Sequence, residues 1–253
     1  MADYEKFKLE CKWNSQQMSM DEQLLKTSMD WITRANGYKY SYNYEWCGRP
    51  IIQYPQDMMA IQEIIWRVKP DLIVETGVAH GGSVILHSSM MALLDLAENN
   101  SRESSHRKVI AIDIEIRSHN RKALEEHPFS DYFELIEASS TAESVIEYVS
   151  EEAAKSKVVL VVLDSNHTHE HVFEELEAYA SLVTRDSYCV VFDTVIEHLP
   201  SDSFPDRSWG VGNNPKTAVL DYLKNHPEFE VDSAIEEKLL ISVAPNGYLK
   251  RVN

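Results

Sequence analysis

Two acidic residues stand at the ends of two apolar runs. Val158–Leu163 is followed by Asp164, and Tyr188–Phe192 is followed by Asp193. A continuous apolar run of this length is typical of a strand buried on both faces of a parallel sheet. Right-handed crossovers bring the carboxyl ends of such strands to one edge, where open α/β sheets bind ligands. With His167 three residues after the first acid, this edge could hold a divalent cation and a general base.

The loop after the first expected strand, residues 72–74, is rich in glycine. Glu75–Ser83 holds three glycines ahead of a helix. Glycine permits a close backbone approach to a ligand, and a helix N-terminus favours an anionic group. Glu75 would repel a pyrophosphate but suits a cationic amino group. The loop therefore favours a zwitterion, such as the amino-acid part of S-adenosylmethionine, over the alternative of a tight turn that binds nothing.

The glycine spacing also bears on which nucleotide could bind. It fits neither G-x-G-x-x-G nor a P-loop, which disfavours an NAD-dependent dehydrogenase. Asp113 ends the second expected strand, where an acid can accept hydrogen bonds from both ribose hydroxyls of an adenosine. Ser139 follows the third strand and suits contact with an adenine ring. Each has a structural alternative, because Asp and Ser are also common helix caps.

Composition narrows the function classes. The chain has 253 residues, is 43% hydrophobic and carries a formal net charge of −17. Such a charge disfavours a nucleic-acid partner, because a phosphate backbone needs clustered Lys and Arg. No run approaches the roughly 20 apolar residues of a membrane span. The start of the chain lacks the features of a signal peptide, so we expect a cytoplasmic protein.

The order of patterns predicts an α/β fold, a doubly wound, seven-stranded and mostly parallel sheet. Residues 1–50 read as an N-terminal helical and aromatic extension, either a lid, an oligomer contact or a segment packed on the core. Residues 51–253 read as the catalytic domain. The expected strands lie at 72–74, 109–112, 132–136, 158–163, 188–192, 229–231 and 239–243. Residues 38–44 alternate like a strand or an extended arm.

Together these residues resemble the seven-stranded S-adenosylmethionine-dependent methyltransferases. More closely, the chain is similar to the cephalosporin hydroxylase/rhamnosyl O-methyltransferase family over roughly residues 46–252. The resemblance rests on the segments Lys69–Ser83, Leu163–His167, Asp193-Thr194, Asn214–Val219 and Asn246–Arg251. It implies methyl transfer to a hydroxyl of a sugar, glycan or secondary metabolite, and a divalent metal, usually Mg²⁺. Hydroxylation is not supported, since the sequence holds no convincing 2-His-1-carboxylate iron set.

The resemblance also implies roles for individual residues. Asp164 and Asp193 correspond to the acids that ligate the metal in related enzymes. The family often has a further acid directly before the second Asp, where this chain has Phe192; Thr194, Glu197 or water could substitute. The implied cofactor-binding residues are Glu75, Thr76, Gly77, His80, Ser83, Asp113 and Ser139. His167 is the expected general base, with Asp164 beside it in the catalytic group, and His198 and Trp209 are candidate substrate contacts.

Two other functions stay open on the sequence. A metal-dependent hydrolase could use Asp164, Asp193 and His167, although Glu75 and Asp113 would then have no ligand role. A non-catalytic methyltransferase-like binding protein is the second, and it is favoured by Phe192, which stands where the family often has an acid. The acceptor is a small molecule or a saccharide, and the aromatic extension makes a homo-oligomer plausible.

Overall fold

A seven-stranded sheet forms the centre of the molecule. The structure, a computed structural model, describes residues 2–253. The strand order is β5-β4-β3-β6-β7-β9-β8; β3 to β7 run parallel, and β9 runs antiparallel to both of its neighbours. The strands are β3 (Leu72–Thr76), β4 (Lys108–Asp113), β5 (Phe133–Glu137), β6 (Val159–Leu163), β7 (Tyr188–Val191), β8 (Phe229–Val231) and β9 (Tyr248–Arg251). The predicted fold class is confirmed.

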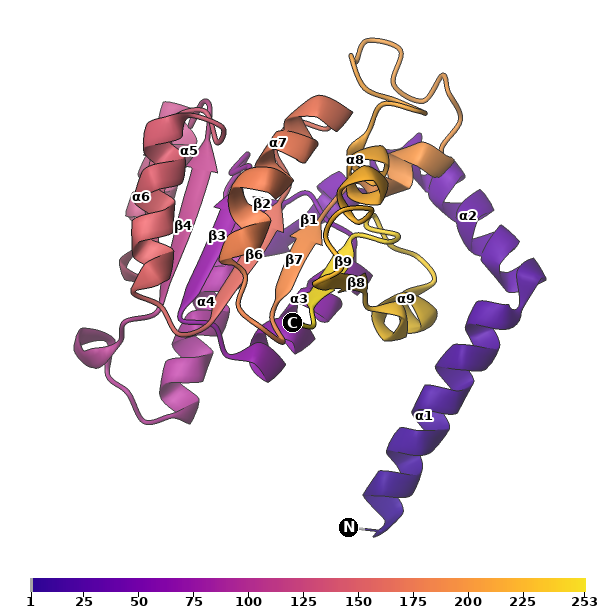
Figure 1. Cartoon of the computed structure of the whole chain (residues 1–253), viewed down its shortest axis with the longest axis horizontal. Helices are drawn as coiled ribbons and strands as arrows, with labels where there is room; N and C mark the ends of the chain where they lie inside the picture. Colours follow the sequence, from indigo (N-terminus) through magenta and orange to yellow (C-terminus); the bar gives the residue numbers. More distant parts are fainter. Residues whose placement is uncertain (1) are drawn as a thin grey trace.

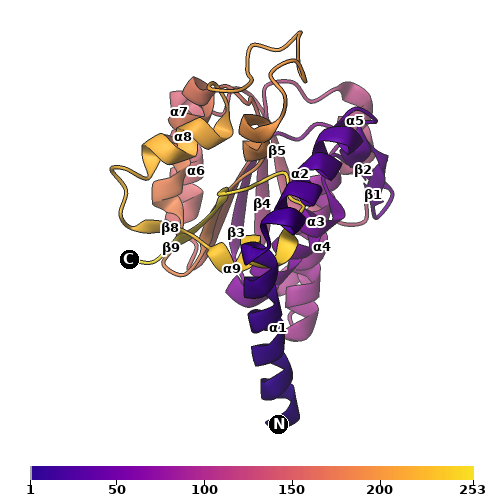
Figure 2. The ribbon, with the colours of Figure 1, turned by 90° about the vertical axis from the view of Figure 1, so that its right-hand side faces the viewer.

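Helices cover both faces of this sheet, giving three layers (Figures 1 and 2). The longer ones are α3 (Pro55–Val68), α4 (Gly82–Ala97), α5 (Ser118–Glu125), α6 (Glu143–Ala154), α7 (His169–Tyr179), α8 (Pro215–Tyr222) and α9 (Ser233–Leu239). Short 3-10 turns occupy Tyr40–Asn43, Arg102–Ser104, Ser130–Tyr132, Ala180–Leu182 and Thr194–His198. One apolar cluster joins the sheet to α3 and α4, and another joins it to α6, α7 and α8. Strands β3, β6 and β7 are buried along their whole length, which explains the unbroken apolar runs of β6 and β7.

The N-terminal region begins with two helices, α1 (Ala2–Met20) and α2 (Glu22–Asn36), and the first was not expected from the sequence. A small hairpin of β1 (Tyr44–Trp46) and β2 (Arg49–Ile51) follows. In both ribbon views α1 projects from the body of the molecule, and its aromatic side chains are exposed. A role for residues 1–50 as a lid or as a contact between copies stays a prediction. No helix among the described residues combines the length and the apolar character that a bilayer crossing requires.

The expected arm over residues 38–44 is wrong for most of its length. Tyr40–Asn43 forms a 3-10 turn, and extended structure begins only at Tyr44. The Tyr40 ring packs edge-on against the rings of Tyr44 and Tyr54, with centroids 5.3 and 5.4 Å apart. Lys39, at φ 52°, turns the chain into this cluster. Only Tyr40 and Tyr44 of the alternating tyrosines join this cluster, while Tyr38 and Tyr42 are exposed, so the alternation does not mark a pleated strand.

The last predicted strand is also wrong, because the final strand is β9 and not Leu239–Val243. Leu239 ends α9, and Val243 lies in an irregular buried segment. The Val243 amide donates to the Asp57 carboxylate at 3.0 Å, so it is not available to a neighbouring strand. The buried Asp57 carboxylate thus occupies an amide that pairing of this apolar stretch with the sheet would need.

Asp57 anchors the C-terminal segment to α3. Its fully buried carboxylate also accepts hydrogen bonds from the Ser242 hydroxyl at 2.6 Å and the Tyr248 hydroxyl at 2.7 Å. Burial raises the pKa of Asp57 to about 6, against the lowering effect of these donors. In the unfolded chain the group titrates near its ordinary value of 3.8. The folded state therefore holds a proton on Asp57 over a pH range in which the unfolded state does not.

This difference predicts a pH-dependent stability. The free energy of unfolding is expected to fall by about 3 kcal/mol from this group as pH rises from about 4 to about 6, and then to level off. The variant Asp57→Asn, which cannot titrate, is expected to lack this decline. Urea unfolding followed by circular dichroism at a series of pH values measures both curves. The exposed variant Glu230→Gln serves as the control, and curves of equal slope for wild type and Asp57→Asn would refute the assignment.

Candidate active site

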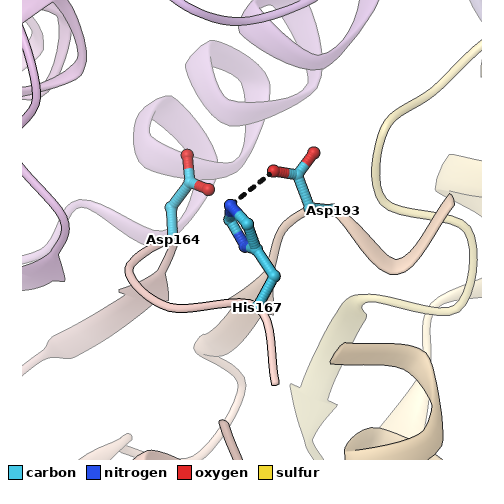
Figure 3. Close-up of side chains that lie close together, drawn as sticks. All are labelled: Asp164, His167 and Asp193. Atoms are coloured by element: carbon cyan, nitrogen blue, oxygen red, sulfur yellow. Dashed lines mark ion pairs between the residues drawn. The ribbon is translucent and has the colours of Figure 1, made fainter. Parts of the chain in front are cut away.

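The carboxyl ends of β6 and β7 bring the two predicted acids together. The strands are parallel neighbours with Leu163 opposite Val191, so Asp164 and Asp193 leave the same edge of the sheet. Asp193 adopts φ 56°, a left-handed conformation that turns the chain sharply at the end of β7. Figure 3 shows both carboxylates directed toward the imidazole of His167.

His167 completes a compact cluster with the two acids. One ligand atom from each of the three residues lies within 4.8 Å of the others, and His167 Nε2 is 3.1 Å from Asp193 Oδ2. His167 lies in the loop before α7 and not within the helix, whose N-cap is Thr168. His169, two residues later, points elsewhere, with Nδ1 2.9 Å from the Thr217 hydroxyl. The loop geometry thus selects one histidine of the three near this position for the cluster.

The environment of Asp164 disfavours its charged form. Burial and the neighbouring charge of Asp193 hold the pKa of Asp164 well above its usual value of 3.8. The side chain of Gln53, from the loop after β2, donates from Nε2 to Asp164 Oδ2 at 3.1 Å. The other amide atom, Oε1, is buried without a hydrogen-bond partner among the described residues. No sequence signal marked Gln53, because it precedes the helix α3 far from either acid in the chain.

These residues fit a divalent cation. Two carboxylates that repel each other at the edge of a cavity are stabilised by a positive charge between them, and Mg²⁺ takes few protein oxygens while keeping several waters.

None of the side chains near the position of the family's further acid is free to act as a third ligand. Phe192 does not face the cluster, since it is buried with its ring edge-on to Tyr248. Thr194 donates to the Pro245 carbonyl at 2.7 Å. Glu197 accepts from the Gly212 amide at 2.8 Å, so it too has other partners, and water is the remaining substitute for a third acid.

A cavity of about 310 Å³ opens beside Asp164, at the ends of β3, β4 and β6. It is lined by Gly77, Ala79, Ile112, Asp113, Ile114, Ser139, Ser140, Asp164, Ser165, Asn166 and His171. Three of the predicted cofactor residues, Gly77, Asp113 and Ser139, are therefore together. A Cβ on Gly77, which has φ 92°, would clash with the Asp164 carbonyl oxygen. The glycine thus lets the loop pass directly over the end of β6.

Asp113 also holds the glycine-rich loop in place. Its Oδ2 accepts hydrogen bonds from the amides of Val78 and Ala79 at 2.8 and 3.1 Å. Its Oδ1 accepts from the Glu115 amide at 3.1 Å. The carboxylate thus lines the cavity and also holds, through these hydrogen bonds, the backbone that forms one of its walls.

The other predicted cofactor residues lie deeper or to one side. The buried carboxylate of Glu75 accepts from the Ser83 hydroxyl and is 2.8 Å from His87 Nδ1, and it does not line the 310 Å³ cavity. Thr76 is fully buried. His80 and Ser83 line a narrower cavity on the other side of Gly77, which also contains Asp164. The pairing of Glu75 with His87 was not visible in the sequence.

A buried network beneath the 310 Å³ cavity was also missed. Glu175, fully buried on α7, accepts from the hydroxyls of Ser140 and Ser165 at 2.6 and 2.7 Å. His171 Nε2 is 3.3 Å from the same carboxylate oxygen, and this contact raises the pKa of His171. The i, i+4 spacing of His171 and Glu175 was the available signal. The network fixes two serines that line the cavity.

A second cavity, of about 840 Å³, adjoins the first. The two share Ile114, Ser165 and Asn166 as lining residues. His167 and Asp193 lie on the larger one, together with aromatic side chains from the 3-10 turn before β1, from the N-cap of α3 and from the 199–214 loop, namely Tyr42, Tyr54, Phe204 and Trp209. A molecule bound in the larger cavity could therefore contact His167 and Asp193 while a second molecule occupies the adjoining smaller cavity beside Asp164.

The structure separates the two candidate substrate contacts. The Trp209 ring packs edge-on against His167, with ring centroids 5.1 Å apart and planes at 84°. His198 instead lines a different, smaller cavity with Leu25 and Glu236. Its Nε2 is 2.7 Å from Lys216 Nζ. Trp209 can contact an acceptor next to the cluster, whereas His198 is directed away from it.

Comparison with known proteins identifies the family of this chain. The sequence profile described as "Rhamnosyl O-methyltransferase/CmcI" matches residues 38–252. The chain belongs to this family. Among similar proteins, a rhamnosyl O-methyltransferase of Mycobacterium leprae (strain TN) is 29% identical over 211 residues, covering 81% of this chain and 82% of the relative. One from Mycobacterium tuberculosis (strain H37Rv) is 28% identical over 200 residues, covering 77% and 73%.

Solved structures of family members share the fold. A CmcI structure described as "Mg-SAM" has a TM-score of 0.54 at 16% identity, covering 84% of this chain and 78% of that one. CalS11, described as a TDP-rhamnose 3'-O-methyltransferase, has a TM-score of 0.52 at 15% identity, covering 89% and 93%. The expected enzyme class, an S-adenosylmethionine-dependent O-methyltransferase, is confirmed by the family.

Proposed function

We propose that this enzyme transfers the methyl group of S-adenosylmethionine to a hydroxyl oxygen of a sugar, with Mg²⁺ and His167 assisting. The observation that carries this proposal is the position of the cluster Asp164, His167 and Asp193 at the junction of two adjoining cavities. The names of the relatives support the acceptor, because the mycobacterial ones are rhamnosyl O-methyltransferases. The description of the CmcI structure supports the metal.

In this proposal the smaller cavity holds the cofactor. Asp113 accepts hydrogen bonds from the ribose hydroxyls, Ser139 contacts the adenine, and the loop at Gly77 lies against the amino-acid part. Thr76, His80 and Ser83 support that loop. Glu75 provides the negative charge beneath the ammonium group, while Ser83 and His87 hold its carboxylate.

The larger cavity holds the acceptor, with its reacting hydroxyl at His167. His167 takes the hydroxyl proton, and Asp193, 3.1 Å from Nε2, stabilises the resulting imidazolium. The acceptor oxygen then forms a bond to the methyl carbon as the sulfur–carbon bond breaks, and the electron pair of that bond goes to sulfur. The products are the methyl ether and S-adenosylhomocysteine. A divalent cation on Asp164 and Asp193 would lower the pKa of the hydroxyl.

Cofactor binding is the first test. Calorimetric titration of S-adenosylmethionine is expected to show micromolar affinity in wild type, and Asp113→Ala is expected to weaken it at least about 10-fold, because a charge-assisted hydrogen bond contributes roughly 1.5–3 kcal/mol. Glu230→Gln, exposed on β8, is the control. Both titrations are run with and without Mg²⁺.

The titration, followed by an assay of turnover, separates the proposed function from its alternatives. Tight binding that depends on Asp113 supports the methyltransferase. Absence of binding under both conditions would contradict the proposed cofactor site and return the acidic cluster to a metal-dependent hydrolase or a non-catalytic binding protein. Binding without turnover on any sugar and any divalent metal would favour a non-catalytic binding protein.

A further inference from the structure

The side chain of Gln53 carries an acceptor atom that no donor of the described chain uses. Gln53 is 5% exposed. Its Nε2 donates to Asp164 Oδ2 at 3.1 Å, while its Oε1 is buried without a hydrogen-bond partner in residues 2–253. A buried polar atom left without a partner costs roughly 1–3 kcal/mol. A site that keeps such an oxygen is therefore expected to receive a donor from outside the chain.

The position of this oxygen sets it apart from the other unpartnered atoms. Of the buried side-chain atoms without a partner in the described chain, only Gln53 Oε1 belongs to a residue that lines a cavity beside Gly77. That cavity is the narrow one, of about 40 Å³, which Asp164 and Ser83 also line. A single water needs roughly 10–15 Å³, so the narrow cavity admits a small polar group.

The backbone holds Gln53 beside the first turn of α4. A Cβ on Gly82, the first residue of this helix, would clash with the Pro50 carbonyl oxygen and with Ile51. Strand β2 therefore packs directly on the start of the helix, and Gln53 follows two residues after Ile51. Gly82 and Ser83 line the same narrow cavity as Gln53. The free amides of a helix N-terminus favour a carboxylate there.

The ammonium group of the cofactor needs an acceptor that Glu75 does not supply by direct contact. The buried carboxylate of Glu75 accepts from Ser83, is 2.8 Å from His87 Nδ1, and lines neither cavity beside Gly77. Glu75 thus contributes charge at a distance. An amide oxygen can accept from an ammonium group without adding a further negative charge next to Asp164. Burial and the charges of Asp193 and Glu75 already raise the pKa of Asp164.

We propose that Gln53 Oε1 accepts a hydrogen bond from the ammonium group of S-adenosylmethionine, while the carboxylate of the same amino-acid part lies at the first turn of α4. This inference rests on the proposed cofactor site and adds to it a residue that the sequence did not single out. Because Nε2 of the same amide donates to Asp164, Gln53 connects the bound cofactor to one acid of the cluster.

Three probes that differ in the amino-acid part test this assignment by binding alone. They are S-adenosylhomocysteine, its deaminated analogue, which keeps the carboxylate and lacks the amino group, and methylthioadenosine, which lacks both. Wild type is expected to bind S-adenosylhomocysteine at least about 10-fold more tightly than the deaminated analogue, since hydrogen bonds to charged groups contribute roughly 1.5–3 kcal/mol. Calorimetry measures all three affinities.

The variant Gln53→Met removes the amide and keeps an unbranched side chain of similar length. It is expected to bind S-adenosylhomocysteine about 10-fold more weakly than wild type. Its affinities for the deaminated analogue and for methylthioadenosine are expected not to change, and this retained binding shows that the variant is folded.

Gln56→Met is the matched control. Gln56 Oε1 is also buried without a partner in the part of the chain that the structure describes. Gln56 lies in the first turn of α3, however, and lines neither cavity beside Gly77. This variant is expected to bind all three probes as wild type does.

Three results would overturn the assignment of Gln53. Wild type could bind S-adenosylhomocysteine and its deaminated analogue equally, or Gln53→Met could bind S-adenosylhomocysteine as wild type does. In the third, Gln53→Met loses affinity for all three probes alike, which would show a structural role only. Each of these leaves the proposed function standing, whereas no binding of any probe to wild type would contradict the cofactor site and the assignment together.

Discussion

Replacing Asp193 with Asn is expected to lower kcat/KM for methyl transfer at least about 10³-fold and to remove the stimulation by Mg²⁺. The variant takes one of the two carboxylates from the cluster, and metal assistance is worth several kcal/mol of transition-state stabilisation. It also lowers the pKa of Asp164, because the charge of Asp193 is one of the causes that raise it. Initial rates over a range of Mg²⁺ concentrations measure the effect.

A binding measurement separates this prediction from misfolding. Mn²⁺ binding, followed by electron paramagnetic resonance, is expected to weaken in Asp193→Asn and to be retained in Glu230→Gln. In wild type the binding is expected to strengthen as pH rises, since Asp164, with its raised pKa, must lose a proton to bind the cation. Unchanged Mg²⁺ dependence in the Asn variant would exclude Asp193 as a ligand.

Replacing His167 with Gln is expected to lower kcat about 10²- to 10⁴-fold, the usual contribution of a general base. S-adenosylmethionine affinity should not change, because His167 lines the larger cavity and not the smaller one.

His169→Gln is the matched control for this experiment. That side chain lies two residues away, contacts Thr217 and does not line either cavity. The Mn²⁺ affinity of His167→Gln, compared with that of wild type, distinguishes two roles for His167. A general base leaves this affinity unchanged on substitution, whereas a metal ligand does not. A large loss of Mn²⁺ binding would make His167 a ligand, and wild-type kcat would remove it from the proton transfer.

The sequence determined the parallel strands of the sheet and the two acids of the site. Buried parallel strands require unbroken apolar runs, so Val159–Leu163 and Tyr188–Val191 could be recognised without their neighbours. Because parallel strands end at one edge, the residues that follow them, Asp164 and Asp193, had to lie close together. His167 followed from its short distance along the chain.

The tertiary structure alone decided the C-terminal strand. Leu239–Val243 is richer in apolar residues than Tyr248–Arg251, which ends in Lys250 and Arg251, so the local pattern favours the stretch that does not join the sheet. The buried carboxylate of Asp57 takes the amide of Val243, a contact across most of the chain. Only the packed structure contains that competitor.

The same reason limits what the sequence could say about the cavities. Gln53 reaches Asp164 across 111 positions, and Ser140 reaches Glu175 across 35. Lys39 and Arg207 line one cavity although they come from opposite ends of the chain. Hydrophobic periodicity in the sequence indicates which face of a helix or strand is buried. It does not indicate which distant element packs on that face. The sequence therefore determined the chemistry of the cluster, and the fold decided which side chains surround it.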